Sequence, residues 1–145
     1  MRFTDKSVII TGGGGKIGKA YAMAFAKEGA KVCLPDIASA DHVVKAIQDM
    51  EGTAISMKCD VTDEKSVKAM VDETAKQFGT IDVLINNAAY FMTVWKGPFW
   101  QMAVDEFDKA MAVNVRGSWL CAKAVVPYMQ TRKRARSSIF PPTWR

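Results

Sequence analysis

A glycine-rich loop near the start of the chain carries the clearest chemical signal in the sequence. It spans Thr11 to Gly18, reads TGGGGKIG, and contains Gly-x-Gly-x-x-Gly from Gly13 to Gly18. The loop directly follows residues 7–10, a short β-branched run that reads SVII. Glycines permit a tight turn with positive φ and let a backbone approach a pyrophosphate closely. A helix that begins after such a loop presents free N–H groups and the positive end of its dipole to phosphate. The loop therefore predicts a dinucleotide site, with a flexible glycine turn as the alternative.

An acidic residue stands where a dinucleotide site needs one. Asp36 follows residues 31–35, a second apolar run, and lies 18 residues beyond Gly18. A carboxylate at the end of a second strand can accept hydrogen bonds from both adenosine-ribose hydroxyls, and it repels a 2′-phosphate. The sequence thus predicts NAD as the cofactor rather than NADP, although Lys16 could attract a phosphate or simply face solvent. For Asp36 the alternative is a helix N-cap or a turn aspartate.

Strand and helix patterns alternate along the chain. Apolar, β-branched runs predict strands over residues 7–10, 31–35, 53–57 and 81–85. Helical spacing predicts helices over 17–28, 38–50, about 63–78 and 104–131. Thr62 or Asp63 is expected to cap the third helix, and the fourth is expected to bend near Gly117. Because the links are short, the strands must pair in parallel through right-handed crossovers, which predicts an α/β fold.

Composition and cysteine usage exclude several classes of protein. The chain has 145 residues, of which 49% are hydrophobic and 24% charged, as in an ordinary soluble domain. No apolar run approaches the roughly 18–20 residues that span a bilayer, and residues 1–6 lack an apolar signal core. Cys33, Cys59 and Cys121 lack metal-ligand spacing, so we expect packing residues in a reducing compartment. The expectation is a cytoplasmic protein without a metal site or a membrane partner.

The positive charge of the chain is concentrated at its C-terminal end. The net charge is +5, and five basic side chains without an acidic one follow Gln130. A basic domain surface would favour nucleic-acid binding. Because these charges belong to one compositionally unusual terminus, we expect no nucleic-acid partner.

Further landmarks follow in order after Asp36. They are Cys59-Asp60-Val61, Asn86-Asn87-Ala88-Ala89 and Asn114-Val115-Arg116-Gly117. Together with the glycine loop and Asp36, they closely resemble the short-chain dehydrogenase/reductase family, over residues 7–130. The resemblance implies a Rossmann-type doubly wound parallel sheet, incomplete at about four strands in the order 3-2-1-4, with helices on both faces. It also implies hydride transfer between a nicotinamide cofactor and an alcohol/carbonyl pair, by relatives that are homo-oligomers at full length.

The resemblance gives each landmark an expected role. Asp60 would hydrogen-bond the adenine amino group, and the Val61 backbone would flank the adenine ring. Asn114 matches the family's catalytic asparagine, whose backbone helps bind a water in a proton relay; without that context it would be a structural polar residue of a helix. The residues expected to bind the cofactor are Gly12, Gly14, Gly15, Lys16, Ile17, Gly18, Asp36, Ile37, Asp60, Val61, Asn87, Ala88 and Ala89. Of these, Lys16 replaces the usual middle glycine of the loop, and Ala89 stands where glycine is more common.

The residues that perform the family's chemistry are missing from this sequence. In the family a serine and a Tyr-x-x-x-Lys pair act on the substrate oxygen, with tyrosine as general acid/base. The tyrosines here are Tyr21, Tyr90 and Tyr128, and none is followed four residues later by lysine. We therefore expect a catalytically incomplete oxidoreductase chain. The alternatives are a non-catalytic dinucleotide-binding or regulatory fragment and, more weakly, an RNA-binding protein with a basic tail.

Residues 131–145 break the pattern of the preceding chain. They have neither helical nor strand periodicity, and Pro141 and Pro142 exclude a central strand. Codons for residues 134–142 can be chosen so that a frame two bases later spells Gly-Lys-Ile-Ile-Asn-Ile-Ser-Ser, as in the family's fifth strand. We therefore expect residues 1–130 to form a partial dinucleotide-binding domain and residues 131–145 to be a poorly ordered tail from a frameshift. Four strands cannot bury all of Met111, Val115, Leu120 and Val125, so part of the long helix should be uncovered.

Overall fold

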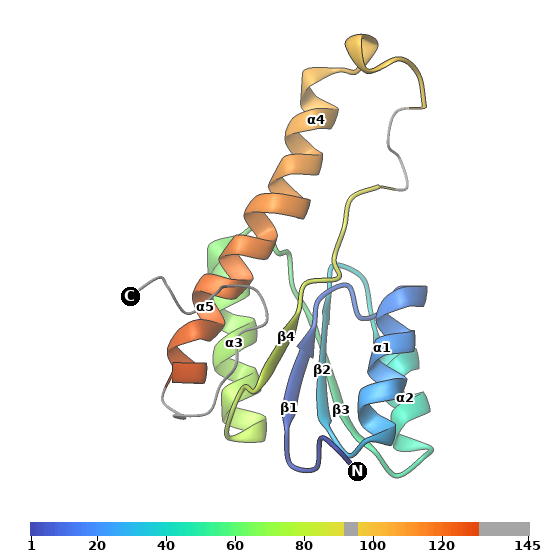
Figure 1. Ribbon diagram of the computed structural model, residues 1–145, viewed down its shortest axis with the longest axis vertical. Helices are drawn as coiled ribbons and strands as arrows, with labels where there is room; N and C mark the ends of the chain where they lie inside the picture. Colours follow the sequence, from blue (N-terminus) through green and yellow to red (C-terminus); the bar gives the residue numbers. More distant parts are fainter. Residues whose placement is uncertain (92–95, 131–145) are drawn as a thin grey trace.

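A parallel β-sheet forms the centre of the molecule (Figure 1). The computed structural model describes residues 1–91 and 96–130. Within them, β1 (Ser7–Ile10), β2 (Lys31–Asp36), β3 (Thr53–Lys58) and β4 (Val83–Ile85) form one sheet in the order β3-β2-β1-β4. Every pairing is parallel. The predicted α/β class and strand order are confirmed, although β4 begins two residues later than expected.

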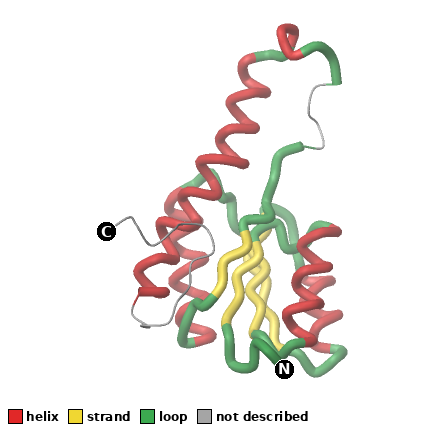
Figure 2. The backbone as a smooth tube through the Cα atoms, in the orientation of Figure 1, coloured by secondary structure: helices red, strands yellow, loops and turns green. Residues whose placement is uncertain are grey.

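Helices cover both faces of this sheet, as Figure 2 shows. On one face α1 (Lys16–Lys27) and α2 (Asp41–Gln48) enclose a core with Val8, Ile10 and Leu34. On the other face α3 (Glu64–Phe78) and α5 (Ser118–Gln130) pack around Ile9 and Cys33. The side chains of β1 thus alternate between two apolar layers and are fully buried. A parallel sheet needs this double cover, because both of its faces are apolar.

The cysteines pack in one apolar layer. Cys33, Cys59 and Cys121 are free, buried and part of the core beneath α3 and α5. Burial raises the pKa of the Cys33 and Cys121 thiols to about 12. Since the thiolate is the reactive form, these side chains are inert packing groups, as the sequence predicted.

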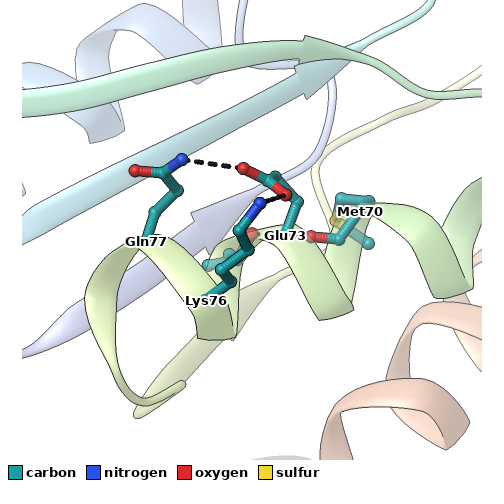
Figure 3. A network of polar contacts seen from close by, with 5 residues as sticks. Met70, Glu73, Lys76 and Gln77 are labelled. Carbon is teal, nitrogen blue, oxygen red and sulfur yellow. Dashed lines mark hydrogen bonds and ion pairs between the residues drawn. The ribbon is translucent and has the colours of Figure 1, made fainter.

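Local hydrogen bonds set the ends of the helices. Asp63 is the N-cap of α3, because its carboxylate accepts from the N–H groups of Lys65 and Ser66 at 3.1 and 3.3 Å. Gly79 ends that helix with φ of 78°. The outer face of α3 carries the pairs drawn in Figure 3, where Glu73 accepts from Gln77 at 2.7 Å and pairs with Lys76 at 3.5 Å. Such exposed pairs one turn apart each contribute only about 0.2–0.5 kcal/mol.

The long C-terminal helix consists of three segments. After the 3-10 turn Phe99–Gln101, α4 (Val104–Met111) leads into a π-helical segment, Ala112–Gly117, and then into α5. The expected bend near Gly117 is thus a π-helical segment that ends there. A Cβ at Gly117 would lie 2.8 Å from Val61 Cγ2, so glycine lets the helix approach the turn after β3.

Helix α4 projects beyond the sheet (Figure 1) and has no buried residue among those described. Leu120 and Val125 are buried on the core-facing side of α5, whereas Met111 and Val115 are exposed. This confirms that the described sheet cannot cover the whole long helix. Residues 131–145, on which the prediction of an unordered tail depends, lie outside the described residues.

Candidate functional site

The glycine loop joins the carboxyl end of β1 to α1. Gly12 has φ of +66°, a conformation that favours glycine. A Cβ at Gly18, in the first turn of α1, would lie 2.3 Å from the Gly12 carbonyl oxygen. The loop therefore folds back on the helix so closely that both positions require glycine.

The first turn of α1 holds the free donors of the site. The N–H groups of Gly12 and Gly13 donate to the Pro35 carbonyl at 2.9 and 3.3 Å, so β2 already uses them. Those of Lys16, Ile17 and Gly18 make no hydrogen bond to any residue that the structure describes. Three adjacent donors at the positive end of a helix form an arrangement suited to a pyrophosphate.

Asp36 lies at the end of β2, beside the glycine loop. Its Oδ2 accepts from the Gly14 N–H at 2.9 Å, and its Oδ1 accepts from the Ala38 N–H at 3.0 Å. The residue is therefore a turn aspartate as well as a candidate ribose ligand, while the residue preceding α2 is Ala40. Lys16 is exposed, and its ammonium group makes no ion pair within the described chain. Ile37 is exposed next to Asp36.

Asn87 fastens the glycine loop to the end of β4. Its Nδ2 donates to the carbonyls of Thr11 and Gly12 at 2.9 and 3.1 Å. The Thr11 hydroxyl oxygen accepts from the N–H groups of Asn87 and Ala88, both at 3.0 Å. Thr11 is a site residue that the sequence analysis did not single out, and its position immediately before the glycines was the available signal. Ala89 follows, exposed, at the same edge of the sheet.

Asp60 and Val61 form the turn that follows β3. Asp60 is exposed, and its Oδ1 accepts from the N–H and hydroxyl of Thr62, both at 2.8 Å. Val61 is buried against Gly117. Since parallel strands end at one edge, this turn shares that edge with Asp36 and the glycine loop.

Asn114 clamps the segment after β4. Its Oδ1 accepts from the Tyr90 N–H at 2.8 Å, and its Nδ2 donates to the Tyr90 carbonyl at 3.3 Å. The Asn114 carbonyl accepts from the Ser118 hydroxyl at 3.0 Å, and the Tyr90 hydroxyl donates to Glu106 at 2.9 Å. Asn114 belongs to the π-helical segment Ala112–Gly117, and such segments are frequent at functional sites. No sequence signal pointed to Tyr90 as its partner.

Comparison with known proteins identifies the family. A family model described as Enoyl-(Acyl carrier protein) reductase matches residues 14–140. The chain belongs to the short-chain dehydrogenase/reductase family. An uncharacterized oxidoreductase of Bacillus subtilis is 42% identical over 130 residues, which are 88% of this chain and 47% of that protein. The 7alpha-hydroxysteroid dehydrogenase of Escherichia coli is 36% identical over 133 residues, 90% of this chain and 50% of that enzyme.

Solved structures of short-chain dehydrogenases share this fold. NAD+-bound xylitol dehydrogenase superposes with a TM-score of 0.85 at 34% identity, over 90% of this chain and 50% of that one. Levodione reductase gives a TM-score of 0.84 at 36% identity, over 90% and 51%. This short-chain dehydrogenase/reductase chain spans about half the length of the curated relatives it matches.

This short-chain dehydrogenase/reductase chain shows no sign of a metal site or a membrane-spanning helix in its described part. Residues 1–91 and 96–130 contain no group of three His, Cys, Asp or Glu side chains that could hold a metal ion. In the same residues no helix is both long and apolar enough to cross a bilayer.

Proposed function

We propose that this chain is the cofactor-binding part of an oxidoreductase that transfers hydride between a nicotinamide dinucleotide and an alcohol/carbonyl substrate. The observation that carries the proposal is the set of free N–H groups at the start of α1, next to Asp36. Two relatives support it: the xylitol dehydrogenase structure contains NAD+, and the Escherichia coli enzyme is a hydroxysteroid dehydrogenase.

The residues present fit such a cofactor. The pyrophosphate would accept hydrogen bonds from the N–H groups of Lys16, Ile17 and Gly18. Gly12 and Gly18 are in close contact and have no side chains, so neither residue would block the approach of the pyrophosphate. Asp36 would accept from the ribose, and Asp60 with Val61 would border the adenine. When bound, the nicotinamide supplies the carbon that accepts or donates hydride. Asn114 would keep its carbonyl available near the cofactor, because a carbonyl oxygen has a second lone pair beyond the one that Ser118 uses.

NAD is the cofactor we propose, because Asp36 places a carboxylate beside the loop, where it would repel a 2′-phosphate. Titration of the purified chain should give at least about tenfold tighter binding for NAD+ than for NADP+, a difference of about 1.4 kcal/mol. Binding can be followed by calorimetry or by nicotinamide fluorescence. Equal affinities would contradict the choice of NAD, and the absence of any binding would contradict the proposed function itself.

The proposed function implies a domain boundary and a cellular compartment for this chain. We propose one cofactor-binding domain over residues 1–130, with residues 131–145 as an aberrant basic tail derived from a frameshift. The buried free thiols of Cys33, Cys59 and Cys121 support a reducing compartment, the cytoplasm.

We also propose that a second copy of this chain covers the exposed face of the long helix. The apolar side chains on this face are three or four residues apart and between 42% and 72% exposed: Val104, Phe107, Met111, Val115 and Trp119. Met111 lies at the centre, so an antiparallel copy would place Phe107 against Val115 of its partner.

Replacing Met111 with glutamate should therefore convert a self-associating chain into a monomer. The substitution places two like charges at the symmetry axis, where burial of an unpaired charge costs several kcal/mol. Sedimentation velocity over a concentration series measures the change. Tyr21→Glu, an equally drastic change at an exposed site on α1, is the matched control and should leave association intact. A wild-type chain that stays monomeric at every concentration would contradict the interface.

A further inference from the structure

Helix α4 projects beyond the sheet (Figure 1), and none of its residues is buried among those described. Of the hydrogen bonds and ion pairs within residues 1–91 and 96–130, only one joins α4 to residues 1–91. In it, the Tyr90 hydroxyl donates to the Glu106 carboxylate at 2.9 Å. Tyr90 belongs to the segment after β4, so this partly buried hydrogen bond links the projecting helix to the carboxyl edge of the sheet.

The backbone of Tyr90 is bound at a second point of the long helix. Its N–H donates to Asn114 Oδ1 at 2.8 Å, and its carbonyl accepts from Asn114 Nδ2 at 3.3 Å. Glu106 lies before the π-helical segment Ala112–Gly117, and Asn114 lies within it. One residue of the loop is therefore bonded to the long helix on both sides of the point where the π-helical segment begins.

The hydrogen bond from Tyr90 has a charged acceptor that is itself held in place. The other oxygen of the Glu106 carboxylate pairs with the Lys109 ammonium group at 3.1 Å. Hydrogen bonds to ionised groups are stronger than those between neutral groups. Because π-helical turns are rare, contacts outside the helix are needed to retain one. The Tyr90 hydroxyl and the Asn114 amide together supply such contacts, since they fix α4 and the π-helical segment to the same loop residue.

The strand order indicates which half of a bound dinucleotide would lie near Tyr90. Asp36 and Asp60 are at the ends of β2 and β3, and the glycine loop follows β1, so the adenosine half would lie over β2 and β3. Strand β4 lies on the other side of β1. The nicotinamide half would therefore extend toward the end of β4, where Tyr90 and Asn114 are hydrogen-bonded.

We propose that the Tyr90 hydroxyl is a positioning group for the nicotinamide half of the cofactor. Through Glu106 it holds α4 and the π-helical segment, and with them the backbone carbonyl of Asn114, in one orientation at the end of β4. Tyr90 acts through Asn114 and not on the reacting atoms. This inference rests on the proposed function, because it requires a nicotinamide dinucleotide at the carboxyl edge of the sheet.

Two substitutions in the full chain remove this hydrogen bond from either side. Tyr90→Phe deletes the hydroxyl and keeps the ring, and Glu106→Ala deletes the acceptor. In both variants the backbone N–H groups of α4 should exchange with solvent about fivefold faster, as expected for the loss of one partly buried hydrogen bond. The affinity for NAD+ should fall by about the same factor. The affinity for ADP-ribose, which lacks the nicotinamide, should stay at the wild-type value.

Three further variants serve as controls. Glu106→Gln keeps an oxygen that can accept from Tyr90, so its exchange rates and NAD+ affinity should remain within about twofold of wild type. The double variant Tyr90→Phe/Glu106→Ala should lose no more than either single variant, because both substitutions remove the same hydrogen bond. Tyr128→Phe is the matched control: it deletes a tyrosine hydroxyl that donates to Asp72 at 2.7 Å, between α5 and α3, and should change neither readout.

Unchanged α4 exchange or unchanged NAD+ affinity in Tyr90→Phe would overturn the inference. Equal losses for NAD+ and ADP-ribose would also overturn it, because they would indicate a general loss of structure instead of a local effect on the nicotinamide half. Each of these results can occur while the wild type binds both ligands. A wild-type chain that binds neither ligand would instead contradict the proposed function on which the inference rests.

Discussion

A Gly18→Ala chain should lose at least about 100-fold in affinity for NAD+, equivalent to about 2.7 kcal/mol of binding free energy. The added Cβ would lie 2.3 Å from the Gly12 carbonyl oxygen and 2.9 Å from Gly13 Cα, and both are backbone atoms. That carbonyl also accepts from Gly15 at 3.2 Å and from Asn87 at 3.1 Å, so it cannot move without breaking the loop. The free N–H groups in the first turn of α1 would then no longer converge on the position proposed for the pyrophosphate.

Thermal or denaturant unfolding of the same variant should show a loss of about 1–3 kcal/mol, the usual cost of overpacking a close contact. Gly15→Ala is the matched control for stability. Its Cβ would find only the Gly12 carbonyl oxygen, at an ordinary 3.5 Å, and its φ of −74° suits any residue. Its unfolding free energy should fall by only about 0.5–1 kcal/mol, because glycine is preferred to alanine at an N-cap but no atoms clash. Wild-type NAD+ affinity in Gly18→Ala would show that the loop does not form the site.

The purified 145-residue chain should bind NAD+ but show no useful turnover with any alcohol or carbonyl compound. It contains no Tyr-x-x-x-Lys, and loss of a positioned general acid/base typically costs about 10²–10⁴-fold in rate. Asn114 cannot replace the missing acid/base group. Its side-chain amide is already bonded to the Tyr90 backbone, and neither this amide nor the Asn114 backbone carbonyl titrates near neutral pH. NADH formation with xylitol and with a 7α-hydroxysteroid measures this outcome.

Titrations of the same sample with NAD+ and with RNA show whether a chain without turnover still binds a cofactor or binds RNA instead. Binding of NAD+ without turnover supports a cofactor-binding part that lacks its chemical groups, whereas robust turnover would contradict the assignment of roles. Tight, salt-dependent RNA binding without NAD+ binding would favour the basic-tailed alternative, because phosphate contacts weaken steeply with salt.

Most of the fold could be predicted from the sequence because its signals are local. Apolar runs such as residues 7–10 and helical spacing in residues 63–78 encode elements directly, and short links leave one parallel arrangement. Boundaries were less certain where polar side chains compete for backbone groups. For example, residues 38–40 form a turn held by Asp36 and Ser39 instead of the first turn of α2.

The sequence by itself determined the glycine loop, Asp36 and the sheet that brings them together, because residue type and spacing alone restrict backbone shape. Only the tertiary structure decided the partners across the chain. Asn87 and Thr11 are 76 positions apart, and Asn114 and Tyr90 are 24 apart, yet each pair is hydrogen-bonded. Such contacts depend on where parallel strand ends and the long helix meet in space. Likewise, only packing decided that Val125 is buried while Met111 is exposed, because α5 lies over the sheet and α4 projects beyond it.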